Sequence, residues 1–161
     1  MSTLPEPLHQ VSPDAVRMWR TTAWLGVLVS ALIVAGLWIF LPSWPWWAWL
    51  LAAVVLLAEI VYAVVSPGLR YRVHRWEVTD EAVYTRTGWL NVAVAIAPLS
   101  RVQTVDLQQG AIMRLYDVAS VTVTTASAAG AIAIEGLDTA TAREVVAHLT
   151  TVTAASEGDA T

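Results

Sequence analysis

The distribution of apolar residues divides the chain into two parts that follow different patterns. Residues 21–41 read TTAWLGVLVSALIVAGLWIFL and carry no charge, and residues 46–65 read WWAWLLAAVVLLAEIVYAVV with one charge, Glu59. Each run is about 20 residues long, so a helix of either run matches the roughly 30 Å hydrocarbon core of a bilayer. The pattern therefore predicts two transmembrane helices.

Only the residues PSWP, at 42–45, separate the two apolar runs, and prolines cannot continue a helix. We therefore expect a tight turn between antiparallel helices, so that the two runs form a hairpin. Tryptophans gather at this end, and indole rings favour the headgroup level of a membrane. An interfacial anchor explains them better than a Trp-rich ligand pocket does. The expected anchors are Trp44, Trp46 and Trp47.

After the second run the sequence changes to the period-two alternation of half-buried strands. The Pro and Gly of SPG, at 66–68, predict the end of the second helix. Beyond them, alternating runs separated by turn residues predict about six or seven antiparallel strands. Strict alternation within one run, 101–109, places Val102 and Val105 on opposite faces. The runs are 71–79, 82–88, 89–98, 101–109, 118–126 and 131–137, with an apolar turn or helical piece at 111–116.

The end of the chain predicts one further helix. Asp138 can cap it by accepting a hydrogen bond from the first free backbone amides. The residues behind it repeat at the spacing of one apolar face, and they are Ala142, Val145, Val146 and Leu149. The expected fold is thus a transmembrane hairpin followed, at 70–153, by an antiparallel β-barrel or sandwich capped by a C-terminal helix. The small polar residues 154–161 predict a disordered tail.

The arginines indicate the orientation of the hairpin. All nine basic residues of the chain are Arg, and the connecting turn has none. Because cytoplasmic flanks of membrane helices carry the excess of basic residues, both termini are expected in the cytoplasm and only 42–45 outside. Residues 1–20 then form a cytoplasmic N-terminal segment. The arginines expected to fix this topology and to meet anionic headgroups are Arg17, Arg20, Arg70, Arg72 and Arg75.

Glu59 lies within the second span, where a charged group is costly. We expect it to be protonated, paired or turned toward another helix. Two interpretations stay open: a hydrogen bond within the hairpin, for example to Ser30 or a backbone carbonyl, and contact with a helix of a partner protein. Proton transport is disfavoured because neither span contains a second acid or base for a relay.

Particular words of the sequence resemble a known family. They are YRVHRWEVTDEAVYTRTGWL at 71–90, IAPLSRVQTVDLQQGAIMRLYDVASVTVTTA at 96–126 and GLD at 136–138. Together with two preceding spans, these words resemble the bacterial pleckstrin-homology (PH) domain of the YdbS-like membrane proteins, over 19–152. One departure is Asp117, where the family commonly has Gly. A Gly there suits a positive backbone angle, which Asp tolerates better than most residues.

The resemblance implies a PH-like barrel tethered to the bacterial inner membrane by a multi-pass anchor. It also implies a non-catalytic domain that often works beside a larger relative with several copies of the same domain. A partner is therefore expected to be another membrane protein, such as that multi-copy relative, or a second copy of this chain.

The residue types exclude most catalytic chemistry. The chain has no Cys, and its histidines, His9, His74 and His148, lie in three distant contexts. The sequence holds no HExxH, no Gly-rich phosphate loop and no Gly-x-Ser-x-Gly elbow. We therefore expect no enzyme activity, cofactor, metal site or small-molecule substrate. The mildly acidic balance, net charge −4, disfavours nucleic-acid binding.

Arg101, at the start of the run 101–109, and Arg114, in the apolar piece that follows it, are the remaining candidates for a site. They could contact a partner, a lipid headgroup or the membrane surface, or could pair with Asp106, Asp117 or a helix end. We expect the protein to bind a partner protein at the cytoplasmic face of the membrane, in envelope maintenance or in resistance to stress or peptides. The alternative is lipid-headgroup binding by the barrel, in sensing or transfer.

Overall fold

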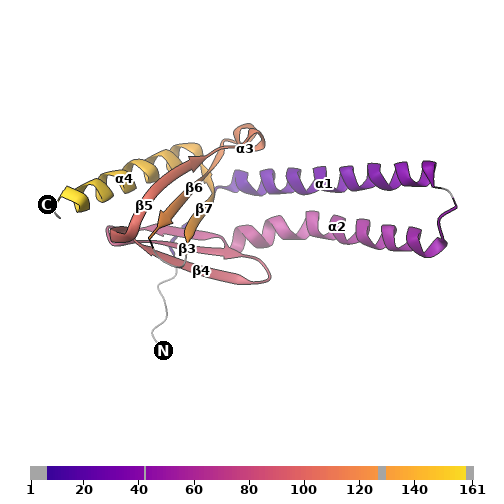
Figure 1. Ribbon diagram of the computed structural model, residues 1–161, viewed down its shortest axis with the longest axis horizontal. Coiled ribbons are helices and arrows are strands. Elements are labelled where there is room, and N and C mark those ends of the chain that lie inside the picture. The colour runs from indigo at the N-terminus through magenta and orange to yellow at the C-terminus, as the bar shows by residue number, and fades with distance from the viewer. Residues whose placement is uncertain (1–6, 42, 127–129, 159–161) are drawn as a thin grey trace, which may run out of the picture.

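Two long helices extend from one side of a domain made of two sheets (Figure 1). The computed structural model describes residues 7–41, 43–126 and 130–158. The helices are α1 (Pro13–Phe40) and α2 (Trp46–Val73), each of 28 residues, and both are long and apolar enough to cross a membrane. In their most apolar 18-residue windows, 0% and 6% of the residues are buried, as expected for side chains that face lipid. The two predicted spans are therefore present as a hairpin.

Helix α1 begins eight residues before the predicted span, because a local cap starts it. The Ser12 side chain accepts a hydrogen bond from the Asp14 amide at 3.3 Å, and Pro13 occupies the first turn, where its missing N–H costs little. Ahead of the cap lies the short strand β1 (His9–Gln10), which the sequence did not predict. The N-terminal segment is thus part of the fold from residue 7 onward, and residues 1–6 lie outside the described residues.

Helix α2 corrects the predicted end of the second helix. It continues through Pro67 to Val73, so SPG does not end it and Tyr71 does not begin a strand. Proline removes one helical hydrogen bond, but the turn that contains Pro67 is buried against the rest of the protein. The packing of this helical turn outweighs the loss of the hydrogen bond at Pro67. The first long strand, β2 (Arg75–Val78), starts only after His74.

The strands form two antiparallel sheets, which a three-residue 3₁₀ turn, η1 (Leu99–Arg101), connects. One sheet has the order β1-β2-β3-β4 and the other the order β5-β6-β7. The strands not yet located are β3 (Ala82–Gly88), β4 (Val92–Pro98), β5 (Val102–Gln108), β6 (Val118–Thr125) and β7 (Ala131–Asp138). Within the described residues the sheets do not join into one closed barrel, so a sandwich describes the domain and the barrel does not.

The C-terminal helix α4 (Thr139–Gly158) covers the sandwich, as predicted. The Thr141 amide donates to the Asp138 carboxylate at 2.9 Å, which confirms the cap. On the apolar face, Ala142, Val145 and Leu149 are buried with the sheet residues of the main core. The helix runs to Gly158 and so includes residues 154–158 of the predicted tail, and 159–161 lie outside the described residues.

Strand β5 departs from strict alternation. A bulge between Val102 and Thr104 shifts the pairing of β5 with β6. Because a bulge adds one residue to one strand, Val102 and Val105 both pack against the main core instead of facing opposite ways. The prediction of opposite faces is therefore wrong.

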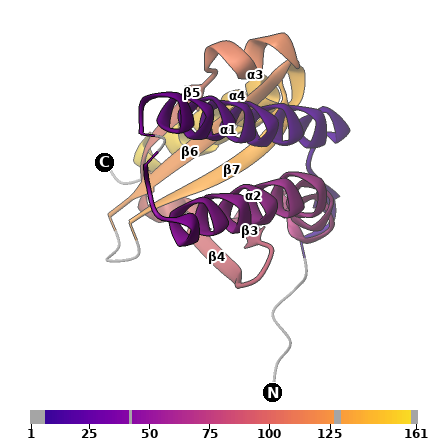
Figure 2. The same ribbon diagram turned by 90° about the vertical axis from the view of Figure 1, so that its right-hand side faces the viewer.

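A second core joins the hairpin to the sandwich. It contains Val11, Ala15, Met18 and Trp19 from the start of the chain and Val118 from β6. Helix α1 also contacts β7, and a view from the turn of the hairpin shows both membrane helices in front of the sheets (Figure 2). The membrane helices are therefore continuous with the folded domain, without a linker between them.

Candidate functional site

Glu59 meets Ser30 across the hairpin. The Ser30 hydroxyl donates to Glu59 Oε1 at 3.0 Å, which is the contact that the first interpretation named. The second carboxyl oxygen, Oε2, is buried and has no hydrogen-bond partner among the described residues. The hydrogen bond of Oε1 thus connects α1 to α2, whereas burial of Oε2 without a described partner is energetically unfavourable. Contact of Glu59 with a partner helix stays a prediction.

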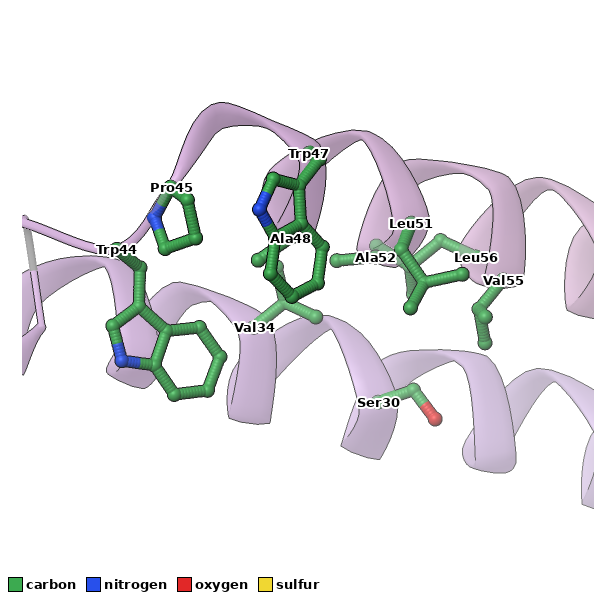
Figure 3. A pocket seen from close by; sticks show the side chains of 10 residues that line it. All are labelled: Ser30, Val34, Trp44, Pro45, Trp47, Ala48, Leu51, Ala52, Val55 and Leu56. Carbon is green, nitrogen blue, oxygen red and sulfur yellow. The ribbon is translucent and has the colours of Figure 1, made fainter.

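An apolar groove of about 520 Å³ runs between the two helices toward their turn (Figure 3). Trp44 and Ser30 lie toward its opposite ends, and small side chains, Ala48 and Ala52, form part of its wall. Trp44 and Trp47 therefore line a groove as well as standing at the expected interface. The exposed fractions of Trp44, Trp46 and Trp47 are 44%, 75% and 58%, so all three rings are available to lipid.

Arg101 and Arg114 do not form one site. Arg101 ends η1 before β5, whereas Arg114 lies in the short helix α3 (Ala111–Leu115), beyond the other end of β5. Seven extended residues separate them by roughly 20 Å. Arg114 Nε donates to the Gln109 carbonyl at 3.5 Å, and neither predicted carboxylate, on Asp106 or Asp117, pairs with it in a described ion pair.

Arg70 is built into the domain. Its guanidinium lies 4.6 Å from the ring centre of Trp19 and 3.3 Å from the Glu135 carboxylate on β7. These contacts hold α2 to α1 and to the sheet, which differs from the predicted role at lipid headgroups. Of the other expected anchors, Arg17 pairs with Asp14 at 3.1 Å. Arg20 and Arg72 are exposed, and Arg75 is half-buried at the start of β2.

His9 and His148 line one pocket with Glu144, and His74 lies elsewhere, but the described residues contain no group of three potential metal ligands. His74 is buried at the end of α2, with its ring 5.1 Å from that of Trp19. Burial lowers the pKa of His74, and the nearby Arg70 charge lowers it further, against the hydrogen bond with the Arg70 carbonyl, which raises it. A buried neutral imidazole fits a structural role.

Asp117 has the backbone angle that its place in the motif suggested. Its φ is +51°, in the left-handed region where Gly is preferred. Its amide donates to the Arg114 carbonyl at 3.3 Å, and its carbonyl accepts from the Thr139 amide at 3.0 Å. The turn between α3 and β6 is therefore formed with Asp in this conformation.

The sequence did not single out the groove where the two sheets part. Strands β4 and β7 each end a sheet, and a groove of about 400 Å³ lies between β3 and β4 on one side and β7 on the other. Apolar side chains on β4 are exposed: Val92 is 47%, Val94 44% and Ile96 38% exposed. The sequence signal was present in VAVAIAP, because a run that is apolar at every position lacks the polar face of an ordinary edge strand.

Two comparisons identify relatives of the chain. A family model described as Bacterial PH domain matches residues 21–152. The UPF0699 transmembrane protein YdbS of Bacillus subtilis (strain 168) is 33% identical over 152 residues, which are 92% of this chain and 96% of that protein. No solved structure matches the chain. With the hairpin, these matches confirm the resemblance and indicate a membrane protein. The chain belongs to the bacterial PH domain family.

Proposed function

We propose that the protein is a membrane-anchored, non-catalytic module that binds a partner protein at the cytoplasmic face of the inner membrane. The observation that carries the proposal is the exposed edge of β4. This edge presents apolar side chains beside the groove that separates the two sheets. The partner is a membrane protein, such as a relative with several PH domains, and the pathway is envelope maintenance or resistance to stress or peptides.

The edge suits an extended segment of another protein. The outer side of an edge strand has backbone N–H and C=O groups free to pair, so an added strand gains hydrogen bonds from the main chain. Exposed edges usually carry Lys, Pro or inward charges that prevent such pairing. Residues Val92–Ile96 carry none of these, and Thr85, Thr87 and Glu135 supply polar groups along the groove. Apolar and polar contacts are thus both available to a partner strand.

Lipid-headgroup binding has weaker support. Recognition of a phosphorylated headgroup needs several basic side chains that converge. Arg101 and Arg114 lie beyond opposite ends of β5, and Arg70 already contacts Glu135. No convergent basic cluster emerges from these positions.

Photocrosslinking in native membranes tests the proposal. The chain has no Cys, so Val94→Cys in the full-length protein gives a single site for a cysteine-directed photocrosslinker. We expect a discrete protein adduct from position 94. Adding Ile96→Lys should abolish the adduct, because a charged edge opposes strand pairing. Leu8→Cys is the matched control, since Leu8 is also exposed, at 72%, but belongs to neither β4 nor β7.

The outcomes separate the candidate functions. An adduct of twice the chain mass would indicate a second copy, and an adduct of any other mass would indicate another protein. Adducts to lipid alone, or equal protein adducts from positions 8 and 94, would contradict binding at the β4 edge.

A further inference from the structure

Two loops of the sheet domain reach the membrane helices at the level where the hairpin enters the bilayer. On α1, the Tyr116 hydroxyl, which follows α3, lies 2.6 Å from the Thr21 hydroxyl. On α2, the ring of Trp89, in the turn between β3 and β4, lies 5.5 Å from that of Tyr62. Figure 1 shows α3 and the β3–β4 turn on the side of the domain from which the hairpin extends.

The lengths of the helices give the depth of these contacts. At roughly 1.5 Å per residue, Thr21 to Phe40 spans about 28 Å, and Trp46 to Tyr62 spans about 24 Å. The hydrocarbon core is about 30 Å thick. With the Trp-rich turn at one interface, Thr21 and Tyr62 therefore lie near the opposite boundary of the hydrocarbon. Tyr116 and Trp89 approach that boundary from the domain side.

Both loops expose apolar side chains beside these aromatic contacts. Leu90, next to Trp89, is 76% exposed, and Leu115, next to Tyr116, is 81% exposed. Arg114 is also exposed and adjoins Leu115. Aromatic rings, leucines and a cation in the same layer match the composition of membrane interfaces, where anionic headgroups attract basic side chains.

We propose that the β3–β4 turn and α3 form a two-point membrane footprint, defined by Trp89, Leu90, Leu115 and Tyr116. The occupant of this surface is the headgroup layer of the leaflet beside which the sheet domain lies. Lipid is the occupant because each of these two segments touches a membrane helix near the end of its span, so the surface is continuous with the hairpin. The footprint supplies a second aromatic belt, opposite the Trp cluster of the turn. It does not depend on partner binding at β4.

Spin-label accessibility in vesicles tests this footprint. Single variants Leu90→Cys, Leu115→Cys and Leu8→Cys of the full chain would carry a nitroxide, in vesicles of phosphatidylethanolamine and phosphatidylglycerol. Relaxation by oxygen, which concentrates in lipid, is compared with relaxation by a water-soluble nickel chelate. Leu8 is the matched control because its exposed fraction is similar, 72%, and it adjoins Glu77 on β2 instead of the hairpin.

The labels at 90 and 115 should show an oxygen-to-nickel ratio several-fold above that at position 8. A ratio at either position equal to that at position 8 would overturn the two-point footprint. Asn91→Cys and Ala111→Cys are exposed neighbours in the same two loops and replace a leucine variant that fails to fold.

Discussion

At the scale of single residues, Gly136 allows the membrane helix to lie against the sheet. Its φ of +79° lies in the left-handed region, and a Cβ built there would lie 3.0 Å from Ala15 Cβ and 3.4 Å from a ring carbon of Trp19. Its carbonyl also accepts a hydrogen bond from the Ser12 amide at 2.7 Å. Both the positive φ and the lack of room for a Cβ therefore favour Gly at position 136, which is the Gly of the GLD motif.

Gly136→Ala should lower the free energy of unfolding by about 2 kcal/mol or more, because backbone strain and crowding add. Denaturation of the purified protein in detergent, followed by circular dichroism, measures the change. Gly26→Ala is the control, since a Cβ there would have no atom within 4 Å beyond its chain neighbours and its own helix backbone, and its φ is not positive. Alanine favours helix, so this control should be neutral or stabilising. Equal losses for the two variants would contradict the role of Gly136.

His74 makes the fold sensitive to mild acid. Burial lowers its pKa in the folded protein from the ordinary value of 6.5, so the unfolded chain binds a proton at a higher pH than the folded chain. The free energy of unfolding should therefore fall as the pH drops below about 6.5, by up to about 1.4 kcal/mol per pH unit, until the folded pKa is reached. Burial raises the pKa of Asp138, but its hydrogen bonds with Thr141 and nearby amides outweigh burial and lower the pKa from 3.8. Asp138 therefore affects the free energy of unfolding only in stronger acid, near and below pH 3.8.

Denaturation curves between pH 7 and pH 5 measure this dependence. His74→Gln should flatten it, because the buried imidazole is then absent. If the free energy of unfolding of the His74 variant still falls with pH, another group is responsible for the pH dependence.

At the scale of elements, the sequence predicted the strands and the apolar runs well, because their patterns are local. The strand 82–88 matches β3, and Ala142, Val145 and Leu149 face the core as expected. The errors arose where distant contacts override a local signal. Pro67 stays helical because its turn is buried. Strand β1 forms because it pairs with β2, 67 and 65 residues away in the register His9–Trp76 and Gln10–Arg75.

The pairing of α1 with α2 leads to a test at Ser30 and Glu59. Ser30→Ala should weaken the hairpin by about 1–3 kcal/mol, because the carboxyl group then loses its partner while it stays buried. Glu59→Leu should be neutral or stabilising, because it removes the buried oxygen that has no described partner. Denaturation in mixed micelles compares the two variants. Greater damage from Glu59→Leu than from Ser30→Ala would contradict a purely internal role for the carboxyl group.

At the scale of the whole molecule, the arrangement of the sheets and the site could not be predicted from the sequence. The words of the PH family predicted a barrel or sandwich, but the open edge at β4 depends on which strands end the sheets. The sequence predicted Arg101 and Arg114 as candidate site residues, but the fold places them beyond opposite ends of β5. The contacts of Val11, Ala15 and Trp19 near Gly136 join segments more than a hundred residues apart. Such contacts leave no periodic signal.

The hairpin and the sandwich form one body through their shared core, and this body holds the β4 edge at a set position relative to the membrane. Spin-label distances in vesicles test this most directly. The labels are attached at Ile39→Cys, an exposed position on α1, and at Ala147→Cys, an exposed position on α4. The pair Ile39→Cys and Val61→Cys, both within the hairpin, gives the reference width. We predict a single distance peak between 39 and 147 that is as narrow as the reference. A broad or multiple distribution, with the reference still narrow, would contradict the claim.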